Sequence, residues 1–197
     1  MNFIVFEGLE GCGKTTQLRL LAAHLTSRGI AHITTRQPSD NPIGTLMRTT
    51  TDGNMTLENE TMALLVAADR YQHMHDIVNP ALKAGQRVLC DRYYYSSFAC
   101  QGIDADVYAR VALYNQCVIA QRKPDITFFI NTSPEECMRR ITTHRKSLGM
   151  YDSVSQLTAI YNRYLMIYNE LKNTDNVVFI DGNDEPSRIA TNILSYL

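Results

Sequence analysis

One run of the chain has residue types and spacing that could hold a chain of phosphates. Residues 8–15, with the sequence GLEGCGKT, fit the pattern G-x-x-x-x-G-K-[ST] in full. Glycines in this pattern let successive backbone N–H groups converge on phosphate oxygens, and the lysine reaches the terminal phosphates. The nucleotide-binding residues that we predict are Gly8, Gly11, Cys12, Gly13, Lys14, Thr15 and Thr16.

A second signal is an acid at the end of a strand-like run. Residues 87–90 are apolar in their centre, and Asp91 follows them directly. In P-loop proteins an acid near this place completes the coordination of Mg²⁺, together with the hydroxyl that follows the loop lysine. We therefore predict that Thr15 and Asp91 hold Mg²⁺, which arrives with the nucleotide.

Three arginines lie where a further anion could bind. Arg36 follows the second strand-like run, Arg92 follows the third, and Arg70 lies in a helical segment. Ligands of open α/β sheets bind beyond the carboxyl ends of the strands, and guanidinium groups bind phosphate in a bidentate manner. The arginines therefore predict a second phosphorylated substrate beside the triphosphate.

The elements that must position these residues alternate between strand and helix. The strand-like runs span residues 3–6, 30–34, 87–90, 126–130 and 177–180, and the helical segments span residues 15–28, 61–83, 104–122, 134–145, 153–172 and 186–197. Most of the strand-like runs are continuously apolar, which is typical of parallel strands buried on both faces. The sequence predicts an α/β fold of three layers, with a five-stranded parallel sheet flanked by helices.

Composition limits the function further. The 197 residues carry 19 Lys and Arg against 20 Asp and Glu, so no basic surface for nucleic acid is expected. The five cysteines form no C-x-x-C pair, and no apolar run is long enough to cross a membrane. We expect one cytoplasmic domain over residues 1–197, with a basic mobile lid at about residues 139–152.

The order and spacing of the motifs resemble the thymidylate kinase family over essentially the whole chain. The runs that carry the resemblance are FEGLEGCGKTT (6–16), TRQP (35–38), LLVAADR (64–70), DRYYYSSFACQG (91–102) and KPD (123–125). The phosphate loop is widely shared, whereas the 91–102 run with the upstream Arg-x-Pro is more specific. The resemblance implies transfer of the ATP γ-phosphoryl group to a deoxynucleoside monophosphate, as in conversion of dTMP to dTDP, by a homodimer.

The resemblance also implies roles for particular residues. Glu10 matches the acid of the family's P-loop, which helps arrange the acceptor and magnesium. Arg36 and Arg92 match a clamp on the acceptor phosphate, and Arg70 matches the arginine that reaches the base. Positions on the base and sugar side of the pocket are Ser97 and Gln101.

The lid follows from the same resemblance. In the family form with glycine after the P-loop acid, as at Gly11, an arginine of the lid is expected to approach the transferred group. We choose Arg140 and Arg145 for this catalytic role, whereas Arg139 and Lys146 also fit a solvated helix face.

Several positions depart from the family pattern. Val66 stands where an aromatic ring usually stacks on the base, and Cys100 stands where a ring usually lies near the deoxyribose. Gln37 replaces the glutamate that usually follows Arg36, and residues 150–152 (MYD) replace Arg-aromatic-Glu. Loss of the two rings predicts space for a 5-substituted dUMP or for a broader set of deoxynucleotides.

Two other reaction classes remain open from the residues. A deoxynucleoside kinase would share the P-loop, but its hydroxyl acceptor would need Glu7 or Glu10 as a base rather than a phosphate clamp. A GTP-binding switch would need an Asn-Lys-x-Asp run on a late strand, and the fourth strand-like run is instead followed by NTSP. The arginines favour the monophosphate acceptor.

Overall fold

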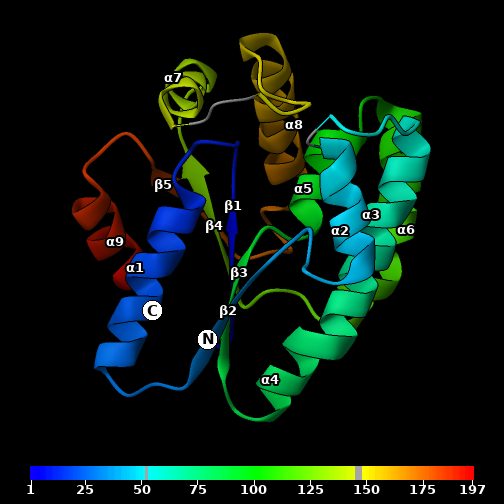
Figure 1. Cartoon of the computed structure of the whole chain (residues 1–197). Helices are drawn as coiled ribbons and strands as arrows, with labels where there is room; N and C mark the ends of the chain where they lie inside the picture. Colours follow the sequence, from blue (N-terminus) through cyan, green and yellow to red (C-terminus); the bar gives the residue numbers. More distant parts are fainter. Residues whose placement is uncertain (52, 145–147) are drawn as a thin grey trace.

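A five-stranded parallel sheet forms the centre of the computed structural model, which describes residues 1–51, 53–144 and 148–197 (Figure 1). The strands are β1 (Phe3–Glu7), β2 (His32–Arg36), β3 (Arg87–Asp91), β4 (Ile126–Asn131) and β5 (Val177–Asp181). Their order across the sheet is β2-β3-β1-β4-β5, and all neighbours pair in parallel. The predicted fold class is confirmed.

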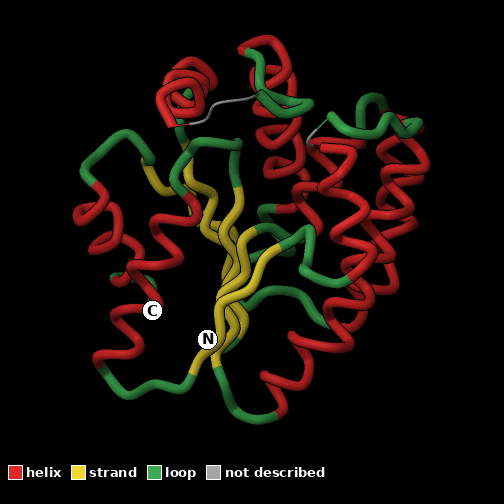
Figure 2. The backbone as a smooth tube through the Cα atoms, in the orientation of Figure 1, coloured by secondary structure: helices red, strands yellow, loops and turns green. Residues whose placement is uncertain are grey.

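Helices cover both faces of the sheet (Figures 1 and 2). One face is covered by α1 (Lys14–Ser27) and α9 (Pro186–Leu194). The other is covered by α3 (Asn59–His73), α4 (Asn79–Lys83), α5 (Tyr94–Gln101), α6 (Ala105–Gln121) and α8 (Val154–Leu171). The helices α2 (Pro42–Thr51) and α7 (Pro134–His144) lie toward the carboxyl ends of the strands. No described helix has both the length and the apolar character needed to cross a membrane.

The sheet is apolar because most of it is covered twice. Every residue of β1 is buried, and so are all residues of β4 except the last. The edge strand β2 is only partly buried. Because parallel strands end at one edge of the sheet, the segments that follow β1, β2 and β3 meet there. The phosphate loop, Arg36, Asp91 and Arg92, which the sequence predicted as site residues, therefore lie at this edge.

The structure differs from the predicted elements in three helices. The predicted helix 61–83 is divided into α3, a π-helical turn η1 (Met74–Val78) and α4, where Pro80 cannot donate a backbone hydrogen bond. Neither α2 nor α5 was predicted. Seven of the eight residues of α5 are buried, so the segment lacks the polar face that reveals a surface helix.

Candidate active site

The phosphate loop closes tightly between β1 and α1. Gly8 and Gly11 have φ angles of 134° and 79°, a region that other residues rarely adopt. A Cβ on Gly8 would lie 2.7 Å from the Ile130 carbonyl oxygen, and one on Gly11 would lie 2.7 Å from the Cys137 carbonyl oxygen. Both glycines are therefore required by backbone conformation and by space. The motif specifies Gly8, whereas Gly11 stands at one of its variable positions.

Lys14, Thr15 and Asp91 lie together at the start of α1. Lys14 Nζ donates to the carbonyl oxygens of Gly8 (3.2 Å) and Leu9 (2.6 Å), so it follows the inside of the loop. Thr15 Oγ1 donates to Asp91 Oδ2 at 2.8 Å, although 76 residues separate them. Because Mg²⁺ binds oxygen ligands and usually one or two carboxylates together with phosphates, this hydroxyl and carboxylate fit Mg²⁺ beside a nucleotide.

Arg92 is held in a strained conformation at the end of β3. Its φ of 75° is the only positive value among the described non-glycine residues. Such a value costs free energy and persists only where the surroundings fix it. Its guanidinium donates to Glu10 Oε2 (2.7 Å), to the Gly8 carbonyl oxygen (3.1 Å) and to Ser96 Oγ (3.1 Å). The predicted clamp residue and the predicted P-loop acid are therefore neighbours.

A buried polar cluster lies next to Arg92 and contacts it through Ser96. Glu7, at the end of β1, accepts hydrogen bonds from the Tyr93 and Ser96 backbone N–H groups, from Ser96 Oγ and from the Tyr164 hydroxyl. Glu7 is 1% exposed and Tyr164 is 2% exposed. This cluster joins β1, α5 and α8, and its residues were not predicted as part of the site except for Glu7 as an alternative base.

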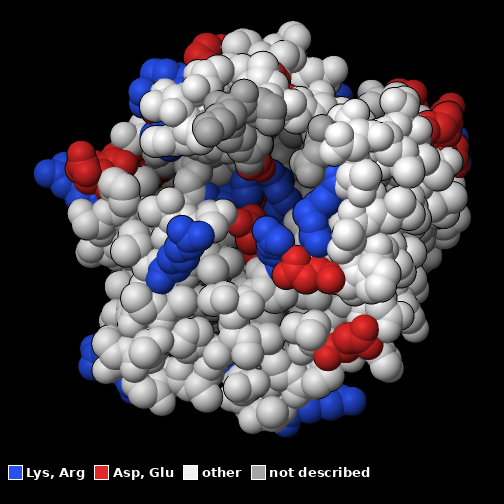
Figure 3. Space-filling view, in the orientation of Figure 1, with Lys and Arg blue, Asp and Glu red and all other residues white. Residues whose placement is uncertain are grey.

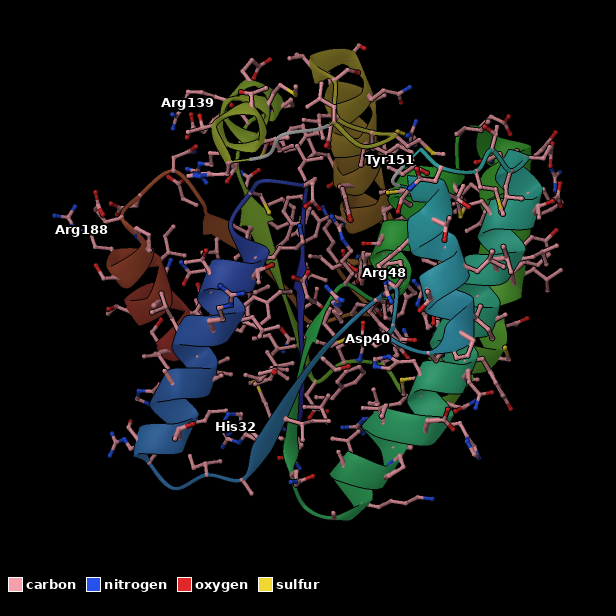
Figure 4. The ribbon with its side chains drawn as sticks, viewed as in Figure 1. His32, Asp40, Arg48, Arg139, Tyr151 and Arg188 are labelled. Carbon is pink, nitrogen blue, oxygen red and sulfur yellow. The ribbon has the colours of Figure 1, made fainter. Side chains whose placement is uncertain are left out.

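Polar residues line the mouth of the cleft beside β2 and α2. Arg36 donates to Asp40 Oδ1 at 2.8 Å, and this bond to Arg36, against a smaller opposing effect of burial, lowers the pKa of Asp40. Arg48 of α2 lies 3.3 Å from the same carboxylate and donates to the carbonyl oxygens of Pro38 and Ser39. Figure 4 shows Asp40 and Arg48 close together. Arg48 was not predicted because α2 itself was not.

Arg70 makes four hydrogen bonds, more than any other arginine that the structure describes. Its Nε donates to Gln37 Oε1 (2.7 Å), Nη1 donates to Ser97 Oγ (2.7 Å) and to Asn115 Oδ1, and Nη2 donates to the Tyr93 carbonyl oxygen (2.9 Å). The side chain is 2% exposed yet lines the cleft. The predicted pair of Arg70 and Ser97 is thus brought together in a fixed geometry.

The cleft beyond Arg70 has a wall rich in methionine. Met47 of α2 and Met62 of α3 pack against Val66, one of the two positions that lack the family's usual ring. Cys100 lines the same cleft, and burial raises the pKa of its thiol. Gln101 Nε2 lies 3.4 Å from the hydroxyl oxygen of Tyr151, its hydrogen-bond acceptor.

The predicted lid is divided between the two sides of the cleft. Residues 139–144 belong to α7, on the side opposite the methionine wall, whereas Met150 N–H donates to the Thr51 carbonyl oxygen of α2. Arg140 donates to Glu136, to the Cys12 carbonyl oxygen (3.3 Å) and to the Gly182 carbonyl oxygen (3.1 Å). Arg139 is paired with Glu136 on the outer side of α7, away from the cleft (Figure 4). Bonds from these two arginines lower the pKa of Glu136 to about 2. Arg145 and Lys146 lie outside the described residues.

These groups surround one large cleft of about 1100 Å³. Figure 3 shows Lys and Arg side chains gathered with acidic ones in the hollow between the two helical layers. The cleft is lined by the following predicted site residues: Gly8, Glu10, Gly11, Gly13, Lys14, Thr15, Arg36, Val66, Arg70, Asp91, Arg92, Ser97, Cys100, Gln101 and Arg140. Cys12 is buried beneath the loop and Thr16 is exposed, so neither lines the cleft. The cleft therefore has room for two ligands end to end, one at the phosphate loop and one between Arg92 and the methionine wall.

Comparison with known proteins agrees with this geometry. The family model described as thymidylate kinase matches residues 6–193. The chain is 35% identical over 201 residues to a thymidylate kinase of Pseudoalteromonas translucida, covering 100% of this chain and 95% of that protein. It is 41% identical over 150 residues to a thymidylate kinase of Bacillus velezensis, covering 72% of this chain and 68% of that protein. A probable thymidylate kinase of Thermococcus kodakarensis is 37% identical over 166 residues, covering 79% of this chain and 78% of that protein.

Proposed function

This chain belongs to the thymidylate kinase family of nucleoside monophosphate kinases, and we propose that it phosphorylates dTMP to dTDP with Mg²⁺ and ATP. The reaction forms a bond between a 5′-phosphate oxygen of dTMP and the γ-phosphorus of ATP, and breaks the bond to the ADP leaving oxygen. Such a transfer depends on positioning and on stabilising charge rather than on a strong base. The enzyme would supply dTDP for deoxynucleotide synthesis.

The observation that carries this proposal is the contact between Arg92 and Glu10 beside the phosphate loop. A nucleoside monophosphate kinase must hold two phosphate-bearing ligands with their phosphates facing each other. Arg92, fixed by Glu10 and the Gly8 carbonyl, lies between the loop and the rest of the cleft. We assign Arg92 and Arg36 to the acceptor phosphate, and Glu10 to the arrangement of acceptor and clamp.

The donor end follows from the loop. Lys14 and the backbone N–H groups of the loop would bind the β- and γ-phosphates of ATP. Thr15 and Asp91 would hold Mg²⁺, which supplies charge neutralisation on the phosphate oxygens when bound. Arg140, which touches the loop at the Cys12 carbonyl oxygen, is proposed as the described lid arginine that helps stabilise the transferred group. Arg145 stays a prediction.

The surroundings of Glu7 argue against a deoxynucleoside kinase. A base for a 5′-hydroxyl must have an oxygen free to reach that hydroxyl. Both oxygens of Glu7 already accept two hydrogen bonds each, and the residue is 1% exposed. Glu10 instead pairs with Arg92, which suits a charged acceptor.

An assay with matched acceptors tests the proposal. The variant Arg92→Lys keeps one positive charge but loses the fork that binds two phosphate oxygens. We expect kcat/KM for dTMP to fall by about 100-fold, or about 2.7 kcal/mol. Thymidine should give no turnover in either protein. Equal kcat/KM for thymidine and dTMP in the wild type would refute a monophosphate acceptor.

The methionine wall favours a second candidate substrate class within the same reaction. Methionine is unbranched and adapts to irregular shapes, and Met47 and Met62 replace rigid ring stacking near Val66. We propose that 5-substituted dUMP is also phosphorylated. The variant Val66→Phe should improve kcat/KM for dTMP and lower it for 5-hydroxymethyl-dUMP. Unchanged values for both nucleotides would contradict this assignment.

An apolar surface on α3 and α6 supports a homodimer. Leu64 and Tyr71, seven residues apart on one face of α3, are 49% and 48% exposed, and Leu113 of α6 is 63% exposed. Exposed apolar side chains on two helices that pack against each other often mark interfaces. We propose that two copies associate through this surface. Light scattering should give a dimer for the wild type and a monomer for Leu113→Asp; a monomeric wild type would refute the proposal.

We also propose a cytoplasmic location and a single-domain organisation. All five cysteines are free thiols, which suits a reducing compartment. The main core runs from β1 to α9, and a small second cluster of Met47, Met62 and Val66 lies at the cleft. We expect a single unfolding transition; two resolved transitions would contradict the single domain.

A further inference from the structure

A chain of hydrogen-bonded side chains runs along the cleft from Arg70 through Gln37 and the buried His73 to Thr35. Arg70 Nε donates to Gln37 Oε1 at 2.7 Å, Gln37 Nε2 lies 3.1 Å from His73 Nδ1, and His73 Nε2 lies 2.6 Å from Thr35 Oγ1. Arg70 and His73 are each 2% exposed and Gln37 is 6% exposed. Neither His73 nor Thr35 has a role in the proposed function.

The chemistry of the donors fixes the protonation of His73. A guanidinium only donates hydrogen bonds, so the carbonyl oxygen of Gln37 must face Arg70. The NH₂ group of Gln37 therefore faces His73 and also only donates. Nδ1 of His73 must then be an unprotonated acceptor, and its ring proton must be on Nε2, directed to Thr35 Oγ1.

We propose that neutral His73 is a positioning residue, which fixes the Gln37 amide and through it Arg70, so that protonation of His73 weakens binding of the acceptor nucleotide. The proposal rests on the proposed function, in which Arg70 reaches the base of the acceptor. It adds an effect of pH on the KM for the acceptor nucleotide.

Protonation of His73 would break the arrangement at one of two places. A protonated imidazole donates from both nitrogens, so Nδ1–H would face the NH₂ group of Gln37. If the amide turned over, its NH₂ group would face Nε–H of Arg70 instead. Either way two donors oppose each other in a buried site, where unsatisfied donors are costly.

Some charged groups around His73 raise its pKa and others lower it. Asp69 of α3, Asp40 of the segment before α2 and Asp76 of η1 favour the protonated form, and Arg70 opposes it. Burial is the largest effect and lowers the pKa of His73 below its usual 6.5. Asp69 is itself occupied, since it accepts hydrogen bonds from the backbone N–H and the hydroxyl of Ser39. The neutral form is therefore the resting form near pH 7.

Two substitutions separate this positioning role from packing. In Gln37→Glu, one carboxylate accepts from Arg70 and from a protonated Nδ1, so the charge on His73 becomes tolerable. In His73→Asn, the side-chain oxygen can take the place of Nδ1 as an acceptor and does not titrate. His75→Asn is the matched control, since the His75 side chain is 77% exposed.

The test measures kcat and KM for dTMP at pH 7.5 and 5.5, with the full chain and saturating ATP. The 5′-phosphate also titrates near pH 6, but this effect cancels in ratios between proteins. We expect the ratio of wild-type KM to Gln37→Glu KM to rise about threefold or more as the pH falls. The ratio of wild-type KM to His73→Asn KM should rise in the same way. The ratio of wild-type KM to His75→Asn KM should not change with pH. A constant ratio, or a change confined to kcat, would overturn the proposal.

An NMR titration of the ring of His73 gives a second readout that needs no turnover. A pKa below 6.5 in the wild type, rising in Gln37→Glu, supports the proposal, and equal pKa values in the two proteins overturn it. Absence of dTMP turnover by the wild type at pH 7.5 would instead count against the proposed function, and the titration would still decide the state of His73.

Discussion

Removal of the Tyr164 hydroxyl tests the buried cluster behind the clamp. The hydroxyl lies 2.9 Å from Glu7 Oε2 and 3.0 Å from Ser96 Oγ, with the side chain 2% exposed. Burial and then the charge of Glu7 raise the pKa of Tyr164, so the hydroxyl stays protonated and donates. In Tyr164→Phe, Glu7 Oε2 keeps only the hydrogen bond from Ser96 Oγ.

The size of the effect follows from this geometry. Hydrogen bonds to charged groups contribute roughly 1.5–3 kcal/mol, so Tyr164→Phe should lower the free energy of unfolding by about 2 kcal/mol. For a chain of this length each kcal/mol moves Tm by about 2–4 °C, which gives a fall of roughly 3–12 °C. The value of kcat should fall less than about tenfold, or 1.4 kcal/mol, because Arg92 keeps its bonds to Glu10 and Gly8.

Urea unfolding followed by far-ultraviolet circular dichroism measures the loss, and calorimetry gives Tm. The matched control is Tyr168→Phe on the same helix, where the ring packs on Phe179 and the described residues offer its hydroxyl no hydrogen bond. This control should change the free energy of unfolding by less than about 0.5 kcal/mol. Equal losses in the two variants would refute a stabilising role for the cluster.

Three further predictions concern the loop and the stability of the fold. Lys14→Ala should lower kcat by about 100-fold or more with an unchanged circular dichroism spectrum; a loss below tenfold would contradict the assigned loop. Gly11→Ala, with a Cβ 2.7 Å from a carbonyl oxygen, should lower kcat/KM strongly. Gly85→Ala has a similar positive φ but open space around its Cβ, so it should lower the free energy of unfolding and leave kcat/KM unchanged. Asp175 is largely buried; burial raises its pKa, but bonds from Lys123, Tyr94 and Tyr95 outweigh this, so the pKa lies below 3.8. The carboxylate therefore stabilises the folded state above about pH 4, and this stabilisation is lost as the pH falls through the folded pKa. Asp175→Asn should lower the free energy of unfolding by about 2 kcal/mol at pH 7 and by less near pH 3. Urea unfolding at the two pH values measures the difference.

Much of the fold and the donor site could be predicted because local patterns determine them. Continuous apolar runs predicted β1, β3, β4 and β5, since covered strands are apolar on both faces. The second run, predicted at residues 30–34, begins two residues before the partly buried β2 (His32–Arg36). The loop pattern predicted the positions of Lys14 and Thr15, and the strand-end rule placed Asp91 beside Thr15. The loop pattern depends only on spacing within a short segment. The strand-end rule depends only on the fact that parallel strands all end at the same edge of the sheet.

The supporting residues could not be predicted in the same way. Tyr164 meets Glu7 across 157 residues of sequence, and nothing local to Tyr164 distinguishes it from the other tyrosines of α8. Arg48 was missed because α2 was missed. The local signal that could have revealed α2 is Asn41, whose side chain accepts a hydrogen bond from the Gly44 backbone, followed by Pro42 at the first helical position. His73 resembles a core histidine until the partners of Gln37 are known.

In the proposed reaction, two phosphate-bearing nucleotides meet between the loop and Arg92. The reaction can be followed directly by ³¹P NMR of a mixture of dTMP, ATP and Mg²⁺ with the wild-type chain, and with Lys14→Ala as the control. We expect stoichiometric appearance of the dTDP and ADP resonances with the wild type alone. Release of inorganic phosphate from ATP with dTMP left unchanged would contradict it.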